Sequence, residues 1–374
     1  MTYDDDNKAE GIPLVTEAAS EYLNPRQEVT FREHRRELIE WFLNLGKNPE
    51  KAVGYSYDNV ENHMNRLDLF YRFVWDRDGK YMQDLSIEGA DDWMRHLAKQ
   101  DLKETTKCHY QKSVQMLFKW QRHARGKDIE WDPVIEYSDP STTYTPRDYL
   151  TREDRRKLRQ AAMEYGSVPH YNSVNPEERE RWKTYLSQRL QKPKEEVTKK
   201  DWNKANSFKY TSMMYTAMDA GLRPCEIERS KVQWVDTDNA VLRIPREDAS
   251  KNRENWIVAL KEETASILDR WLDERETWEK YDGRDELWLT MYGNPYNRYS
   301  FRDVFRKLAT EAGLDLENRD LSPYSIRHST ATFVAEEEGL AVAAAQCRHK
   351  SKRTTEKYEH SSVSRQSDAV NSID

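Results

Sequence analysis

A proline-rich stretch near the middle of the chain, DPVIEYSDPSTTYTPR at residues 132–147, limits what the chain can fold into. Because proline lacks a backbone N–H and fixes φ, the three prolines here prevent a continuous helix or a central strand from crossing the stretch. The chain has 374 residues, enough for two domains. We therefore predict domains at residues 23–131 and 148–374, with residues 132–147 as their linker and residues 1–22 as an acidic flexible N-terminus.

The first predicted domain carries apolar residues at helical spacing. In DNVENHMNRLDLFYRFVWD they recur every three to four positions, at Met64, Leu67, Phe70 and Val74. Gly46 is placed to end an earlier helix that starts at Thr30. We expect this domain to be all-helical, with helices over residues 30–46, 58–76, 86–100 and 105–125.

The second predicted domain changes its pattern partway along. Thr151, with Asp154 three residues later, predicts the N-cap of one helix, and SFKYTSMMYTAMDAG predicts another that ends at Gly221. Three short β-prone segments follow, VQWV, AVLRI and NWIVAL, and helical patterns then return, including everything after Tyr324. The charged segment 166–203 shows no regular pattern. The predicted fold class is mainly α with a small antiparallel β-sheet, an all-helical domain followed by a mixed α+β domain.

Composition excludes some classes of protein. The 37% of hydrophobic residues would suit a disordered chain, but 12 tryptophans and 21 tyrosines indicate packed cores under a charged surface. No apolar run approaches the ~18–20 residues of a membrane span, and the start MTYDDDNKAE is unlike a signal peptide. We expect a soluble cytoplasmic protein with no membrane partner. The widely spaced cysteines, Cys108, Cys225 and Cys347, are expected to be reduced.

Basic residues gather in two places, although the net charge of the chain is −7. Residues 101–127 hold seven Lys and Arg against two acids, and residues 341–360 hold five against two. Local charge rather than net charge governs binding to an anion, so these two places indicate an anionic partner. A basic helix face is more often simply solvated, but the scarcity of acids between residues 105 and 125 favours phosphate contact. The candidate contact residues are Lys107, Lys112, Lys119 and Arg122.

Three further basic residues have ordinary explanations when each is taken alone. Arg223, in AGLRPCEIERSKV, could be a surface or capping residue, and Glu226 could simply favour the helix dipole. Lys251 lies in a predicted turn between two strands. Arg327, in LSPYSIRHSTAT, is followed by small residues that allow close packing, so we expect it to be partly buried beside an anionic group.

Together, four motifs resemble the tyrosine recombinases, or phage-type integrases. GLRPCEIERSKV is similar to the first arginine motif, AVLRIPREDASKNRENWIVAL to the β-hairpin that presents a lysine, and LSPYSIRHSTAT to the second arginine motif. CRHKSKRTTEKYEH is similar to the final segment, where His349 precedes Tyr358 by nine positions and follows Arg327 by 22. The resemblance covers about residues 147–365. It implies that the preceding helices form the core-binding, SAM-like DNA-binding domain of that family.

The resemblance implies a role for each matching residue. Tyr358 would be the nucleophile that forms a 3′-phosphotyrosyl bond, and Lys251 the general acid for the leaving 5′ oxygen. Arg223 and Arg327 would bind the non-bridging phosphate oxygens through their planar donor forks. His349 would donate to the same oxygens or help accept the tyrosine proton. Neither a metal nor another cofactor is expected, because the arginines stabilise the charge that develops.

The sequence departs from the family pattern at two places. Tyr324 stands where the family usually has histidine, three residues before the second arginine, so it could contact phosphate or only pack. Cys347 and Arg348 replace the usual Leu-Gly before the late histidine. Two supporting residues are also expected, His328 beside the second arginine and Glu226 as a group that orients a neighbouring base.

The function that the resemblance implies is a site-specific DNA recombinase or integrase acting on double-stranded DNA with a defined target site. We expect a homotetramer on DNA, a monomer or weak oligomer when free, and association with the nucleoid. Two alternatives stay open. One is a type IB topoisomerase, which relaxes DNA without exchanging partners, and the other is a DNA-binding protein of this fold without catalysis.

Overall fold

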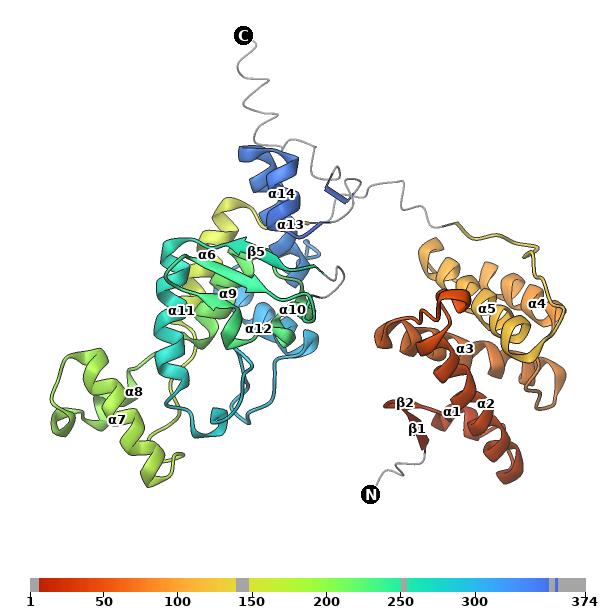
Figure 1. The fold of residues 1–374 in the computed structure, drawn as a ribbon, viewed down its shortest axis with the longest axis horizontal. Coiled ribbons are helices and arrows are strands. Elements are labelled where there is room, and N and C mark those ends of the chain that lie inside the picture. Colours follow the sequence, from red (N-terminus) through yellow and green to blue (C-terminus); the bar gives the residue numbers. More distant parts are fainter. Residues whose placement is uncertain (1–6, 139–147, 250–253, 350–353, 356–374) are drawn as a thin grey trace, which may run out of the picture. The chain divides into compact units, whose positions relative to one another are not determined.

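The computed structural model (Figure 1) describes four parts of the chain, residues 7–138, 148–249, 254–349 and 354–355. The chain divides into two compact units, Met1–Tyr144 and Thr145–Asp374. Each unit has its own cluster of buried hydrophobic side chains and is described by itself.

Helices form most of the first unit, namely α2 (Pro25–Asn44), α3 (Tyr57–Asp78), α4 (Ile87–Ala98) and α5 (Glu104–Arg125), with a short 3-10 turn η2 (Pro49–Lys51). α3 contacts the other three α-helices, and α2 and α4 both contact α5. The predicted helices are confirmed. The apolar face expected on α3 is fully buried at Met64, Leu67, Phe70 and Val74. α2 begins earlier than expected because Asn24 and Gln27 form a capping box around Pro25.

The beginning of the chain differs from the flexible N-terminus that its acidic composition predicted. β1 (Lys8–Ala9) pairs with β2 (Ile12–Pro13) in an antiparallel hairpin, and α1 (Glu17–Ser20) follows. Ile12 and Leu14 are fully buried in the core of the first unit. Burial of these apolar side chains orders residues 7–20 despite the acids around them. Residues 1–6 lie outside the described part of the chain.

The first residues of the predicted linker pack on the first unit. Tyr137 is buried, and its hydroxyl donates to the carbonyl of Met94 at 2.8 Å. Its backbone N–H donates to Oε1 of Gln111 at 2.7 Å. These two bonds attach the chain to α4 and α5 up to this point; residues 139–147 lie outside the described part.

The second unit is built around α9 (Phe208–Ala220), most of whose side chains are buried. α9 contacts α6 (Arg152–Glu164), α11 (Glu262–Arg275), α13 (Pro323–Glu338) and the sheet (Figure 1). Thr151 caps α6 and forms the expected capping box with Asp154. The remaining helical elements are α7 (Pro176–Leu190), η3 (Lys194–Glu196), α8 (Lys199–Asn203), α10 (Pro224–Arg229), η4 (Val232–Trp234), η5 (Glu279–Tyr281), α12 (Arg298–Glu311) and α14 (Leu340–Gln346).

The predicted small antiparallel sheet is confirmed. Its strands are β3 (Val235–Asp236), β4 (Val241–Ile244) and β5 (Trp256–Ala259), in the order β3-β4-β5. Leu242 of β4 lies opposite Val258 of β5, and both side chains face the core. The alternation of buried and exposed residues along β4 and β5 follows the two-residue period of a strand that is covered on one face.

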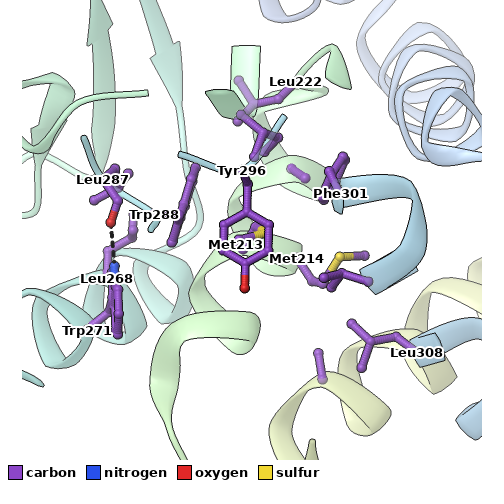
Figure 2. Close-up of a cluster of buried hydrophobic side chains, with 14 of the residues drawn as sticks. Met213, Met214, Leu222, Leu268, Trp271, Leu287, Trp288, Tyr296, Phe301 and Leu308 are labelled. Carbon is purple, nitrogen blue, oxygen red and sulfur yellow. Dashed lines mark hydrogen bonds between the residues drawn. The ribbon is translucent and has the colours of Figure 1, made fainter. Parts of the chain in front are cut away.

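Large side chains from several elements pack against α9. Figure 2 shows Met213 and Met214 of α9 among Trp271, Trp288 and Phe301, which come from α11, the segment before α12, and α12. The Trp271 indole N–H donates to the carbonyl of Leu287 at 3.0 Å, so this large ring is buried without losing a hydrogen bond. The packing fixes α9, whose C-terminal end leads into the candidate site.

The charged segment 166–203 is mostly helical, where the sequence showed no regular pattern. α7 and α8 carry Trp182 and Trp202, which are both buried and lie 6.1 Å apart between ring centroids. Trp182 also meets Trp278 of the main body edge-on, with centroids 5.5 Å apart. Two tryptophans among many charged residues are too few to reveal a helical period, yet they anchor the segment. In Figure 1, α7 and α8 lie at the end of this unit away from α14.

Candidate active site

Gly221 allows two distant segments of the chain to meet. It ends α9 with φ of +54°, in the left-handed region that glycine adopts readily. A Cβ atom at this position would lie 3.0 Å from Sγ of Cys347, closer than ordinary packing allows. The absent side chain therefore leaves room for the turn that carries His349, and the chain continues within two residues to Arg223.

Arg223 and Glu226 form a small unit at the start of α10. The backbone N–H of Arg223 donates to Oε2 of Glu226 at 2.7 Å, and Nη1 of its guanidinium donates to Oε1 at 2.8 Å. The side chain of Arg223 is 12% exposed and that of Glu226 is 3% exposed. This carboxylate thus fixes the direction of the guanidinium.

Arg327 is more deeply buried than the sequence predicted. It lies on α13 with 4% of its surface exposed. Its Nη1 donates to the carbonyl of Gly221 at 2.6 Å, and its Nη2 donates to the carbonyl of Cys347. The guanidinium donates to these backbone oxygens, and the carboxylate of Glu226 lies near it. The small residues that follow Arg327 allow α13 to lie close to α9. Thr330 is one of them, and its Oγ1 donates to the carbonyl of Met218 in α9 at 2.5 Å.

Arg348, noted in the sequence only as a departure from the family pattern, lies at the centre of this arrangement. It is 2% exposed and has φ of +56°, a left-handed conformation. Its Nη1 donates to the carbonyl of Ala220 at 2.7 Å, and its Nη2 donates to Oε2 of Glu226 at 2.7 Å. The carbonyl of Arg348 in turn accepts a bond from Nη2 of Arg223 at 3.3 Å. The signal that could have found it was its place directly before His349, where the family has glycine.

His349 follows in the same turn. Its backbone N–H donates to the carbonyl of Ala344 at 2.8 Å, which attaches the residue to α14. Nδ1 of its ring lies 3.3 Å from Oγ1 of Thr355. Burial, followed by the charges of Arg327 and Arg223, lowers the pKa of this imidazole to about 3. The ring is therefore neutral at physiological pH.

The site concentrates positive charge around one carboxylate. In the described part of the chain, Arg223, Arg327 and Arg348 all lie near Glu226. Burial opposes ionisation of Glu226, but the three guanidinium groups outweigh it and lower the pKa of the carboxyl to about 2. Burial also lowers the pKa of Arg327 to about 10, so this side chain stays cationic at neutral pH. Such a cluster suits an anionic group with several oxygens.

Tyr324 and His328 lie beside this cluster. Tyr324 is 42% exposed, in the first turn of α13, and burial, followed by the charge of Cys225, raises the pKa of its phenol. His328 is half-buried, and its charge is among the influences that lower the pKa of His349. Tyr324 and His328 thus lie on the same helix as Arg327, with Tyr324 exposed to solvent.

Two of the five principal residues lie outside the described part of the chain, Lys251 and Tyr358. The strands that flank Lys251 in the sequence, β4 and β5, are paired, as a hairpin requires. The backbone N–H of Arg246 donates to Oδ1 of Asn255 at 2.9 Å beyond the ends of both strands. His349 and Thr355, on the N-terminal side of Tyr358, are described and lie at the cluster.

The four candidate DNA contacts on α5 differ in their surroundings. Lys112 and Arg122 are exposed, and Arg122 lies 4.0 Å from a carboxylate oxygen of Glu130. Lys119 donates from Nζ to the carbonyls of Gly46, at 2.8 Å, and Lys47, at 3.3 Å. Lys107 is half-buried, with Nζ 5.9 Å from the centre of the Tyr137 ring. Two of the four thus face solvent and two are engaged within the first unit.

Within the described ranges, no group of three or more His, Cys, Asp or Glu residues is arranged to hold a metal ion. No helix in those ranges combines the length and the apolar character needed to cross a bilayer.

The chain belongs to the phage integrase family, whose family model matches residues 177–365, about half of the chain. This match contains all of the motifs that suggested the resemblance, from the first arginine to the late tyrosine. The predicted membership among the tyrosine recombinases is therefore confirmed. No curated protein sequence matches the chain.

Solved structures of recombinases share the fold. An XerH site-specific recombinase bound to a palindromic difH substrate is 14% identical, with 95% of this chain and 90% of that chain covered and a TM-score of 0.57. A lambda integrase dimer bound to a COC′ core site is 12% identical, with 91% and 82% covered and a TM-score of 0.53. A Tn1549 transposon integrase in complex with transposon right end DNA is also 12% identical, with 90% and 98% covered and a TM-score of 0.51. The predicted fold class is confirmed.

Proposed function

We propose that this chain is a site-specific DNA recombinase of the integrase type, which cleaves and rejoins DNA strands through a 3′-phosphotyrosyl intermediate. The observation that carries the proposal is the convergence of Arg223, Arg327 and His349 from the start of α10, from α13 and from the turn after α14. Three groups that suit a phosphodiester meet at one place although they lie far apart in the sequence.

Arg223 and Arg327 would bind the non-bridging oxygens of the target phosphate. A guanidinium presents a planar fork of donors, and both forks are held by bonds to Glu226 or to backbone carbonyls. Because their directions are fixed before DNA arrives, little reorganisation is needed when negative charge grows on the pentacoordinate phosphorus. The arginines would supply this stabilisation without a metal or another cofactor.

Tyr358 would attack phosphorus through its phenol oxygen. The new O–P bond forms as the bond from phosphorus to the 5′ oxygen breaks, and the tyrosine proton passes to an acceptor. His349 would help accept it or would donate to the phosphate oxygens. Its pKa of about 3 makes it a weak base without DNA, and binding of an anionic phosphate would raise that pKa. Lys251 would give a proton to the leaving 5′ oxygen. The phosphotyrosyl bond conserves the free energy of the phosphodiester, so rejoining to another strand needs no ATP.

The first unit would act as the core-binding domain over residues 23–131, with residues 132–147 as the linker and residues 148–374 as the catalytic domain. Lys112 and Arg122 are the α5 residues best exposed for phosphate contact. One related structure is a lambda integrase tetramer bound to a Holliday junction, with a TM-score of 0.50. We extend this assembly to the present chain as a homotetramer on double-stranded DNA, working in the cytoplasm at the nucleoid.

Covalent capture of DNA tests the proposal. The purified protein is incubated with a pool of nicked duplexes whose central base pairs are randomised, and adducts are isolated under denaturing conditions. We expect adducts joined at a 3′ phosphate, and sequencing of the captured DNA should give a defined site. Tyr358→Phe should bind the selected DNA with unchanged affinity and form no adduct, because the attacking oxygen is absent.

Each other outcome selects a different function. DNA binding without any adduct from the wild-type chain would favour the binding protein that has this fold and no catalysis. Adducts without sequence preference, together with relaxation of a supercoiled plasmid, would favour the topoisomerase. Adduct formation by Tyr358→Phe would assign the nucleophile to another residue.

A further inference from the structure

Arg348 links two segments that each carry a residue of the proposed active site. It directly precedes His349, and its guanidinium reaches across to the end of α9 and the start of α10. Nη1 donates to the carbonyls of Ala220, at 2.7 Å, and Gln346, at 3.0 Å. Nη2 donates to the carbonyl of Gly221 at 3.2 Å and to Oε2 of Glu226 at 2.7 Å. The Arg348 side chain thus forms hydrogen bonds both with its own segment and with the segment that joins α9 to α10.

The carboxylate of Glu226 is shared between two arginines. Its Oε1 accepts from Arg223 and its Oε2 accepts from Arg348, each as a short charge-assisted bond. The carbonyl of Arg348 also accepts from Nη2 of Arg223 at 3.3 Å. Arg223 is therefore held by Glu226, which also binds the side chain of Arg348, and by the backbone carbonyl of Arg348. A displacement of the His349 turn would move Arg223 with it.

The backbone at Arg348 supports this interpretation. Its φ of +56° lies in the left-handed region, which is costly for a residue that carries a Cβ atom and easy for glycine. Glycine would therefore make the turn with less strain. The hydrogen bonds of the Arg348 guanidinium offset the cost of this backbone conformation. Arg348 therefore contributes to the site through its side chain as well as through the turn.

We propose that Arg348 is a positioning residue of the active site, whose guanidinium fixes the distance between the His349 turn and the Arg223 loop through Glu226 and the carbonyls of Ala220 and Gly221. This inference rests on the proposed function. At 2% exposure Arg348 is covered by protein, so it acts through Arg223 and His349 and does not itself touch DNA. Fixed spacing between the groups that meet the phosphate matters because a displacement of about 1 Å can slow a reaction ~10²-fold.

Glu226 carries the electrostatic part of this arrangement. Within the described part of the chain, the charged or titratable groups that act on it or that it acts on include Arg348, Arg223, Arg327, Cys347 and Tyr324. Burial favours the neutral carboxyl, and Arg348 is the largest influence in the opposite direction. Loss of the Arg348 guanidinium should therefore raise the pKa of this carboxyl, and the site would lose its ordered anion as the pH falls.

Two variants and a matched control test the role. Arg348→Gly removes the guanidinium and keeps a residue that favours the left-handed turn, while Arg348→Lys keeps the charge without the fork. Gln191→Gly is the control, because Gln191 also has positive φ, 53°, and lies at the exposed end of α7. For each protein we would measure the affinity for the captured duplex, the single-turnover rate of adduct formation, its pH dependence, and the melting temperature.

We expect Arg348→Gly to bind DNA within about threefold of the wild-type affinity and to form the adduct about 10- to 10²-fold more slowly. The acid limb of its rate profile should move up by about one to three pH units. Arg348→Lys should recover part of the rate, and Gln191→Gly should match the wild type. In combination with Glu226→Gln, Arg348→Gly should add little, because both changes break one network.

An unchanged adduct rate and pH profile in Arg348→Gly would overturn the proposal, as would loss of rate that adds fully to the loss in Glu226→Gln. If Arg348→Gly does not fold, the Arg348→Lys variant decides, and a wild-type rate in that folded variant would overturn the role of the fork. Absence of adduct from the wild-type chain would contradict the proposed function instead, so the two failures are distinguishable.

Discussion

Each unit of this chain buries an arginine among backbone carbonyls, and the surroundings of the two residues differ. In the first unit Arg35 is 1% exposed, with Nη1 donating to the carbonyl of Met64 at 3.1 Å and Nη2 to that of Pro13 at 3.2 Å. In the second unit Arg327 is 4% exposed and likewise donates to two carbonyls. By burial and hydrogen bonding alone, the two arginines are alike.

Their charged neighbours separate them. Burial lowers the pKa of Arg35, and the nearby carboxylate of Asp68 opposes that shift. Arg327 also has groups nearby that oppose the shift, Cys347 and Glu226, but it lies beside Arg223 and Arg348, whose positive charges add to the effect of burial. Carbonyl dipoles are enough to hold one buried guanidinium, so burial by itself indicates packing. Several cations gathered against their mutual repulsion indicate a site for an anion.

The largest expected effect is on catalysis in the second unit. Arg327→Ala should slow adduct formation about 10²- to 10³-fold, because it removes a fixed donor to the phosphate in the transition state. Single-turnover cleavage of the captured duplex measures this loss. If the variant binds DNA and cleaves at the wild-type rate, Arg327 would have to be grouped with Arg35 as a packing residue.

Glu226→Gln should cost the second unit stability in a pH-dependent way. The carboxyl has a pKa of about 2 in the folded chain, against 4.5 ordinarily, so its contribution is present above about pH 4.5 and is lost as the pH falls toward 2. At neutral pH we expect the variant to be less stable by about 3 kcal/mol, since the buried Arg348 and the partly buried Arg223 lose their anion. Urea unfolding at a series of pH values measures the difference. A difference that stays constant down to pH 2 would contradict the role of ionised Glu226.

Arg35→Ala should affect stability and leave chemistry unchanged. The carbonyls of Met64 and Pro13 would lose their donor inside the core, at a cost of about 1–3 kcal/mol. Denaturant unfolding measures this cost, and the adduct rate per folded molecule should equal that of the wild type. A lowered rate in the folded variant would show that burial of Arg35 serves the reaction as well.

The smallest expected effects concern exposed charge on α5. Lys112→Ala should weaken DNA binding and reduce the slope of log affinity against log salt by about one, as for one phosphate contact. Lys119→Ala should leave that slope unchanged, because the ammonium already donates to the carbonyls of Gly46 and Lys47 at the end of α2. Binding measured from low to high salt compares the two. Equal salt slopes in both variants would contradict the prediction that Lys112 contacts phosphate and Lys119 does not.

Much of the fold could be predicted because it depends on local patterns. The period of Met64, Leu67, Phe70 and Val74 is that of one helix face, and the change to short β-prone segments after Gly221 marked the sheet. Order and spacing of the four motifs indicated the family before any contact was known. The structure of the first 22 residues and of the segment 166–203 could not be predicted from the sequence. Each has a charged composition, and only a few buried side chains hold it in place.

The sequence by itself determined most of the helices, the three-stranded sheet, the family, and the residue types at Arg223, Arg327 and His349. Only the tertiary structure decided what surrounds them. Arg348 meets Glu226 across 122 positions and Ala220 across 128, and such partners leave no periodic trace in the sequence. Long-range packing also places Lys119 against the end of α2, 73 positions away from Gly46. A local pattern specifies which side chains turn inward, whereas the partner that each one meets depends on how distant segments pack.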